Sequence, residues 1–175
     1  LVESKSGERG IFNRVSAQKQ AAKNGRRNPD YEFGTNPCSE IILRPHQFCN
    51  LTEVVIKEHD TDEDLDRKVR LATILGTAQA TLTDFPYLRK IWKSNTQEER
   101  LLGVSLTGIM DNIHTNCFLV NMRERLTRLK QIAIDTNKKY AKRFGIEEST
   151  AITCVKPSGT VSQLCDSASG IHARH

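Results

Sequence analysis

One short segment of the sequence brings together an amide, a thiol and a carboxylate. Residues 36–40 read Asn-Pro-Cys-Ser-Glu, and a proline disfavours a helical conformation of the residue before it, so we expect an extended or turning loop. In an extended chain alternate side chains point the same way, so Asn36, Cys38 and Glu40 would share one face. Such a set can bind a sugar hydroxyl, abstract hydrogen and remove a proton. By spacing alone the functional signal is weak, and a small buried cysteine beside a surface glutamate is the favoured interpretation.

A second thiol follows at Cys49, within a segment rich in strand-forming residues. It is either an ordinary core cysteine or a redox thiol that faces Cys38. His46 lies close by in the sequence, but too few further ligands are in register with it, so no metal site is expected.

Residues 156–162 read Lys-Pro-Ser-Gly-Thr-Val-Ser and lie between a predicted strand and a predicted helix. Backbone N–H groups at the start of a helix bind phosphate, and serine and threonine hydroxyls add donors. The segment lacks the Gly-Lys-Ser/Thr ending of a P-loop, so it predicts either a phosphate site or an ordinary capped turn. The candidate phosphate ligands are Pro157, Ser158, Gly159, Thr160 and Val161.

The elements that would position these residues alternate between strands and helices. Strands are predicted at 41–43, 48–56, 101–109 and 151–155, and helices at about 15–23, 61–83, 121–144 and from 161 onward. The helix that begins at Thr61 or Asp62 has a wide apolar face, which includes Leu71 and Leu75 and is expected to be buried. The alternation predicts a parallel α/β architecture, with too few strands to close a barrel by itself.

The composition of the chain excludes several classes of protein. The chain has 175 residues, a net charge of +5 and five cysteines, without the paired spacing of a zinc ribbon or the cysteine density of a secreted disulfide scaffold. No apolar stretch approaches the roughly 18–20 residues of a membrane span, and the start is not a signal peptide, so a cytoplasmic location without membrane contact is expected. The charge suits a nucleotide ligand or a solvated surface. The basic residues lack the interleaved aromatics of a single-strand binder, so stable nucleic-acid binding is not expected.

In combination, these segments resemble the adenosylcobalamin-dependent (class II) ribonucleotide reductases, and within them the ribonucleoside-triphosphate reductase branch. The segments that carry the resemblance are 36–44, 47–55, 100–108, 153–164 and 169–172, in order along the chain. The resemblance implies that residues 1–175 are one partial domain, the C-terminal part of a ten-stranded α/β barrel. Its finger loop would be at about 34–44 and its phosphate-binding segment at about 156–164.

The resemblance also implies a role for each site residue. Cys38 would become a thiyl radical with the help of adenosylcobalamin and take the 3′ hydrogen of the ribonucleotide. Glu40 would act as general base on the 3′ hydroxyl, and Asn36 would bind the ribose. Cys49 would be one of two thiols that supply reducing equivalents as the 2′ hydroxyl leaves as water. The implied reaction turns ribonucleoside triphosphates into 2′-deoxyribonucleotides for DNA synthesis, with a thioredoxin-like reductant and a deoxynucleotide effector site outside this chain.

Two features depart from the family pattern. Position 39 is serine, where glycine is more usual, and the partner thiol of Cys49 is expected upstream of residue 1. None of the other cysteines, Cys117, Cys154 and Cys165, lies in a segment that matches the one expected to carry this partner thiol. Because both ends of the sequence look cut, the chain is expected to be an internal piece that is inactive alone. Two alternatives stay open: a reductase of another class with a diphosphate substrate and a separate radical source, and a non-catalytic nucleotide-binding module.

Overall fold

The computed structural model describes residues 5, 10–112 and 121–174. Its helices and strands are α1 (Arg14–Ala22), β1 (Gly34–Thr35), β2 (Ile42–Leu43), β3 (Asn50–Val55), α2 (Asp62–Gln79), α3 (Lys90–Glu99), β4 (Leu102–Thr107), the short 3-10 helix η1 (Ile109–Asp111), α5 (Met122–Phe144) and α6 (Thr160–Leu164).

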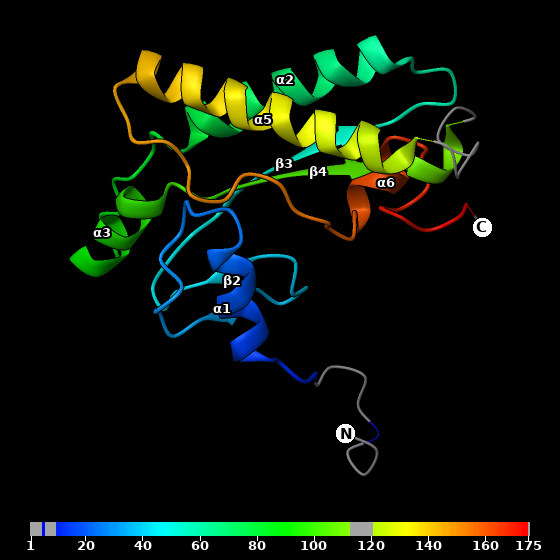
Figure 1. The fold of residues 1–175 in the computed structure, drawn as a ribbon. Coiled ribbons are helices and arrows are strands. Elements are labelled where there is room, and N and C mark those ends of the chain that lie inside the picture. Colours follow the sequence, from blue (N-terminus) through cyan, green and yellow to red (C-terminus); the bar gives the residue numbers. More distant parts are fainter. Residues whose placement is uncertain (1–4, 6–9, 113–120, 175) are drawn as a thin grey trace.

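The centre of the fold is a pair of parallel strands under a layer of two helices (Figure 1). β3 and β4 pair in parallel with Asn50 opposite Leu102, and α2 packs on both strands and on α5. Their apolar side chains form the main core, which includes Val54, Leu65 and Leu129. The predicted parallel α/β arrangement is therefore confirmed.

The strand predicted at 151–155 forms only a single parallel bridge, between Val104 and Thr153. The Val104 N–H donates to the Ile152 carbonyl at 2.8 Å, and the Val104 carbonyl accepts from the Cys154 N–H at 3.1 Å. This extended segment therefore continues the sheet beyond β4, in the spatial order β3, β4, segment 151–154.

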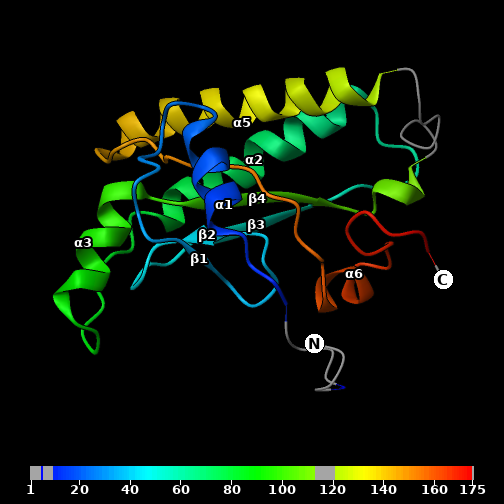
Figure 2. The ribbon, with the colours of Figure 1, turned by 60° about the horizontal axis from the view of Figure 1, so that its bottom comes forward.

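A small hairpin lies on the face of the sheet opposite α2 and α5 (Figures 1 and 2). β1 and β2 pair antiparallel, with Gly34 opposite Leu43. Ala17 and Ala21 of α1 pack against Phe33, which leads into the hairpin. The predicted helix at 15–23 and the short strand at 41–43 are confirmed.

The wide apolar face predicted for α2 is only partly buried. The buried residues of the helix are Leu65, Val69, Thr73, Gly76 and Thr77. The two threonines are tolerated there because each hydroxyl donates to the carbonyl four residues earlier at 2.7 Å.

The prediction that Leu71 and Leu75 are buried is wrong for this chain. Their exposures are 59% and 64%. Both leucines border a hollow along β3, and among the described residues β3 pairs only with β4. In the described part of the chain the outer edge of β3 is uncovered, which explains why this side of α2 stays in contact with solvent.

The helix α3 was not predicted. It contains only two large apolar residues, Ile91 and Trp92, so it has no helical hydrophobic period to detect. It ends at Arg100, which adopts a left-handed conformation with φ 48°. None of the described helices is both long enough and apolar enough to cross a membrane.

The start of α2 carries a complete capping box. The Thr61 hydroxyl accepts from the Asp64 N–H at 3.2 Å, and the Asp64 carboxylate accepts from the Thr61 N–H at 3.2 Å. Thr61→Ala is therefore expected to lower the free energy of unfolding by about 1 kcal/mol. Urea titration measures this. Thr81→Ala removes an exposed hydroxyl just after the same helix and is expected to have a smaller effect; equal losses would contradict the assignment.

Candidate functional site

The loop that carries Cys38 is a tight turn rather than an extended tip. The Asn36 N–H donates to the Ile41 carbonyl at 3.3 Å, and the Ser39 N–H donates to the Asn36 carbonyl at 3.0 Å. Ser39 adopts φ 63°, which is left-handed. The expectation that residues 36, 38 and 40 share a face by strand alternation is therefore not met by the backbone. The left-handed backbone gives a physical reason for glycine being more usual at this position, because glycine adopts it without strain.

The predicted site residues of this loop differ in their surroundings. Cys38 is exposed at the tip, whereas Glu40 is half-buried. The Asn36 side-chain oxygen accepts from the Ile41 N–H at 3.1 Å, so it stabilises the hairpin. The Glu40 Oε2 atom is shielded from solvent and has no hydrogen-bond partner among the described residues. The Glu40 carboxylate therefore has one shielded oxygen that can accept a hydrogen bond from a ligand.

The face of the sheet beneath the hairpin carries two thiols, Cys49 and Cys154. Burial raises the pKa of the Cys49 thiol to about 12, and the neighbouring Cys154 adds to this rise. Arg27 acts in the opposite direction and Glu40 in the same one. Burial likewise raises the pKa of Cys154 to about 12, with a further contribution from Glu40. Glu40 and Cys154 line the same cavity, and both raise the pKa of Cys49, while Cys38 stays exposed at the hairpin tip.

Gly103 allows this close approach. A Cβ atom at this position of β4 would lie 3.0 Å from Ile41 Cδ1 of the hairpin and 3.2 Å from Cys154 Sγ, and it would overlap Leu51. A side chain at position 103 would force the side chains of Leu51, Ile41 and Cys154 to shift.

The high pKa of Cys49 sets a pH dependence of stability. The thiol keeps its proton up to about pH 12 in the folded chain but loses it near 9.0 when unfolded. Between these values the folded state binds more protons, so the free energy of unfolding falls as pH rises, by up to about 1.4 kcal/mol per pH unit. Below pH 9 the group contributes no slope. Urea unfolding at pH 8 and pH 10 measures the loss, and Cys49→Ala is expected to have a shallower slope; identical slopes would contradict it.

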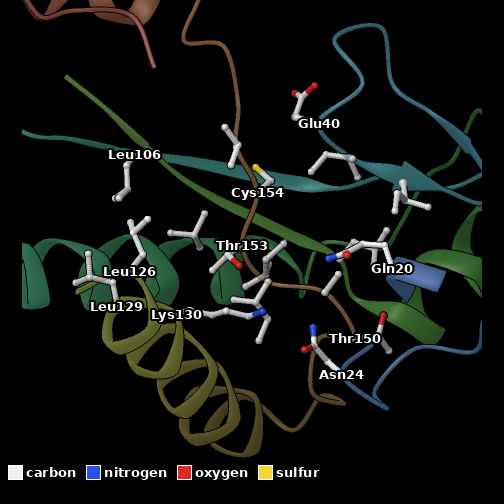
Figure 3. Close-up of a pocket in the computed structure, with 18 of the residues that line it drawn as sticks. Gln20, Asn24, Glu40, Leu106, Leu126, Leu129, Lys130, Thr150, Thr153 and Cys154 are labelled. Atoms are coloured by element: carbon white, nitrogen blue, oxygen red, sulfur yellow. The ribbon is translucent and has the colours of Figure 1, made fainter. Parts of the chain in front are cut away.

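A cavity of about 510 Å³ opens beside this cluster. Figure 3 shows Glu40 and Cys154 on one side of it and Leu126, Leu129 and Lys130 of α5 on the other. Most of its other lining residues are apolar. It runs along segment 150–155 and joins the hairpin side of the sheet to the helix layer.

The predicted phosphate segment forms the start of α6. The Ser158 side chain is buried, and its hydroxyl accepts from the Ser162 N–H at 3.0 Å. It therefore caps the turn internally. Gly159 has φ 60° and nothing within 4 Å of where a Cβ would stand. Thr160 is exposed, so this part of the turn is accessible to a ligand. Pro157 is exposed and Val161 half-buried.

The turn at 167–170 is fastened to the end of β4. The Gly108 N–H donates to the Ala168 carbonyl at 2.9 Å, and the Thr107 hydroxyl accepts from the Gly170 N–H at 2.7 Å. A Cβ on Gly170 would come within 3.0 Å of the Lys156 carbonyl. These contacts hold residues 156–162 at the carboxyl end of the central strands, where α/β proteins commonly bind ligands.

Three residues of this region were not predicted as site residues. Two of them, Cys154 and Arg27, act on the pKa of Cys49, which Cys154 raises and Arg27 lowers. Glu53 of β3 has both carboxylate oxygens shielded and without a hydrogen-bond partner in the described structure, and it contributes to the raised pKa of Cys154. Only Cys154 carried a signal in the sequence, as a cysteine in a predicted strand. Cys117 lies outside the described residues.

Metal binding and cofactor binding are assessed from different features of the structure. Among residues 5, 10–112 and 121–174, no group of histidine, cysteine, aspartate and glutamate side chains is arranged to hold a metal ion. For adenosylcobalamin, the relevant observation is that Cys38 is exposed at a hairpin tip, where a large cofactor can approach its sulfur directly.

The chain resembles known proteins in both sequence and structure. It is 30% identical over 141 residues to a probable adenosylcobalamin-dependent ribonucleoside-triphosphate reductase of Dictyostelium discoideum, which covers 80% of this chain and 18% of that protein. It is 28% identical to an adenosylcobalamin-dependent ribonucleoside-triphosphate reductase of Lacticaseibacillus paracasei over 98% of this chain and 26% of the relative. No protein-family model matches the chain.

The structural comparison agrees. A crystal structure of a B12-dependent (class II) ribonucleotide reductase superposes with a TM-score of 0.62 and 27% sequence identity, covering 79% of this chain and 22% of that one. The chain thus spans about a fifth to a quarter of these relatives. As its motifs predicted, the chain is homologous to a segment of the adenosylcobalamin-dependent, class II ribonucleotide reductases.

Proposed function

We propose that this chain is part of the catalytic barrel of a class II ribonucleotide reductase that converts ribonucleoside triphosphates to 2′-deoxyribonucleotides in the cytoplasm. The observation that supports this most directly is the placement of the Cys38 hairpin over the sheet face that bears Cys49. The negative charge of Glu40, on the same hairpin, raises the pKa of both Cys49 and Cys154. The phosphate ligands would be residues 157–161 at the far end of the strands.

The open edges of the sheet support an incomplete barrel. Among the described residues the outer edge of β3 is unpaired, and the apolar Leu71 and Leu75 stand exposed beside it. The apolar cavity along segment 150–155 marks the other edge. Further parallel strands from the rest of a longer protein would cover both edges and close the ring.

The residues divide the reaction among them. Adenosylcobalamin, when bound, supplies the radical chemistry that the protein then positions and shields. Cys38 exchanges a hydrogen atom with the 3′ carbon of the ribose, and Glu40 takes the proton of the 3′ hydroxyl. Asn36, at the start of the hairpin loop, binds the ribose. Cys49 and a second thiol give up two electrons and two protons and become a disulfide, while the 2′ hydroxyl leaves as water. A thioredoxin-like dithiol would restore the two thiols, and the effector site would lie outside this chain.

The test uses the longer protein that contains this chain. It is incubated with each ribonucleoside triphosphate and a dithiol, with and without adenosylcobalamin, and deoxynucleotides are measured by chromatography. We expect product only with the cofactor, and none from the 175-residue chain alone. Activity that requires a separate radical-generating subunit, or that uses only diphosphates, would assign the protein to another class. Nucleotide binding without reduction under any condition would favour a non-catalytic module.

A further inference from the structure

One buried ion pair connects the hairpin to the body of the molecule. Arg27 and Glu99 have side chains only 5% and 3% exposed. Arg27 Nε and Nη2 donate to the two carboxylate oxygens of Glu99 at 2.8 and 2.9 Å. Gln47, also buried, accepts from Arg27 Nη2 at 3.3 Å and donates to the same carboxylate. This two-pronged geometry fixes the guanidinium in both position and orientation.

The same guanidinium holds both strands of the hairpin. Arg27 Nη1 donates to the Ile42 carbonyl in β2 at 2.8 Å. Its central carbon lies 4.7 Å from the centre of the Phe33 ring, directly before β1. Arg27 is therefore one of the points at which the hairpin bearing Cys38 and Glu40 is attached, together with Arg44, which donates to Glu98 and Asn95 of α3.

Glu99, the acidic partner of Arg27, lies close to both segments that carry the buried thiols, Cys49 and Cys154. The Glu99 carbonyl accepts from the Thr150 N–H at 3.0 Å, at the start of the segment that leads to Cys154. Two residues further, the Leu101 carbonyl accepts from the Asn50 N–H at 2.9 Å, directly after Cys49. Residues 99–101 therefore fix the positions of both thiols, and Arg27 connects them to the hairpin.

The charge of Arg27 also reaches the Cys49 thiol. Three groups act on Cys49 from the elements around it: Cys154 from the neighbouring segment, Glu40 from the hairpin and Arg27 from the loop before β1. Arg27 is the only one of these three that favours the thiolate. An exposed ion pair would be worth little. A buried one is often replaceable by apolar side chains without loss of stability, so stability alone does not require a charge here.

We propose, on the basis of the proposed function, that Arg27 is a positioning residue of the reductase site, fixed by Glu99 and Gln47. It holds the Cys38 hairpin against the sheet. Through its contact with Gln47, two residues before Cys49, it also places a fixed positive charge near the thiol that must ionise when its disulfide with the second thiol is formed and reduced. Reactive cysteines in general depend on such nearby cationic groups.

Two charge-balanced variants and one control test this in the full chain. Arg27→Lys keeps the positive charge but loses the paired hydrogen bonds of the guanidinium to Glu99. The double variant R27Q/E99Q removes both charges together. Neither variant therefore leaves an unpaired buried ion. Arg128→Met is the control, because Arg128 pairs with Asp62 and Asp66 of α2, away from the hairpin. Amide hydrogen exchange and alkylation of individual cysteines, both followed by mass spectrometry, are the readouts.

In both Arg27 variants the amides of Asn36 and Ser39, which close the hairpin loop, are expected to exchange at least about tenfold faster, while those of β3 and β4 stay protected. At pH 9, Cys49 in R27K should react with iodoacetamide at least about threefold faster than in R27Q/E99Q. The Arg128 control should match the wild type in both readouts. Unchanged hairpin exchange, equal loosening of the hairpin and the central strands, or equal Cys49 rates in the two variants would each overturn the proposal.

Activity of the longer protein separates this inference from the proposed function. R27K is expected to lower kcat with little change in the KM for nucleotide, because the phosphate segment lies elsewhere. If the wild-type protein reduces no nucleotide while the exchange and alkylation results hold, the proposed function fails and the positioning role of Arg27 stands.

Discussion

Replacing Cys38 with serine is expected to abolish nucleotide reduction in the longer protein, with a loss of at least about a thousandfold, as is usual when a group that acts on the reacting atoms is removed. The oxygen–hydrogen bond of serine is too strong for the hydroxyl to relay a radical, and no other thiol lies on the hairpin. Product formation with saturating adenosylcobalamin, measured by chromatography, gives the residual rate.

The matched control is Cys165→Ser. Cys165 is a half-buried cysteine at the end of α6, outside the proposed machinery, and the same substitution there should leave the rate within about twofold. Wild-type activity in the Cys38 variant would eliminate radical chemistry at this loop and favour the nucleotide-binding alternative. Folding of both variants is checked by their unfolding midpoints in urea, which should match, because Cys38 is exposed.

The largest stability effect is expected for Gly108→Ala, a loss of about 2–4 kcal/mol. Gly108 has φ 73°, and a Cβ there would lie 2.5 Å from the Ile56 carbonyl oxygen and 3.3 Å from Ser167 Cβ. The first of these is backbone at the end of β3, which cannot move without breaking the pairing with β4. The substitution should therefore combine left-handed strain with a steric overlap.

Gly145→Ala isolates the first of these two costs. Gly145 ends α5 with φ 69°, but nothing lies within 4 Å of its added Cβ, so only the left-handed strain of about 1 kcal/mol applies. Urea unfolding of both variants measures the difference. Equal losses in the two would show that the contact with Ile56 is not the cause.

The sequence was most informative where local chemistry dictates the backbone. The start of α2, predicted at Thr61 or Asp62, and the end of α5, predicted at 144, were correctly placed, because helix caps act within one turn. The helix α3 was missed because its contribution to the fold is polar: Asn95 and Glu99 are buried through hydrogen bonds to Pro45 and Arg27. Hydrophobic periodicity does not register such contacts.

The candidate site was predictable in its parts and not in its assembly. Cys38, Glu40 and Cys49 could be identified from motifs, but the turn that separates Cys38 from Glu40 depends on a left-handed serine. The approach of Cys154 depends on a glycine in β4, more than fifty positions before it. Parallel pairing joins residues that are far apart in sequence, and no local sequence pattern predicts which of them come into contact.

The unpaired edge of β3 has a practical consequence for anyone who expresses this segment in isolation. Its outward backbone groups form a template for another strand, and of these groups the described residues cover the Val55 carbonyl alone, through the Lys68 ammonium at 3.0 Å. Two copies can therefore pair edge to edge through β3, with Leu71 and Leu75 of each copy at the interface. We expect the isolated segment to self-associate on concentration, and a charged residue introduced at position 71 or 75 to reduce this association.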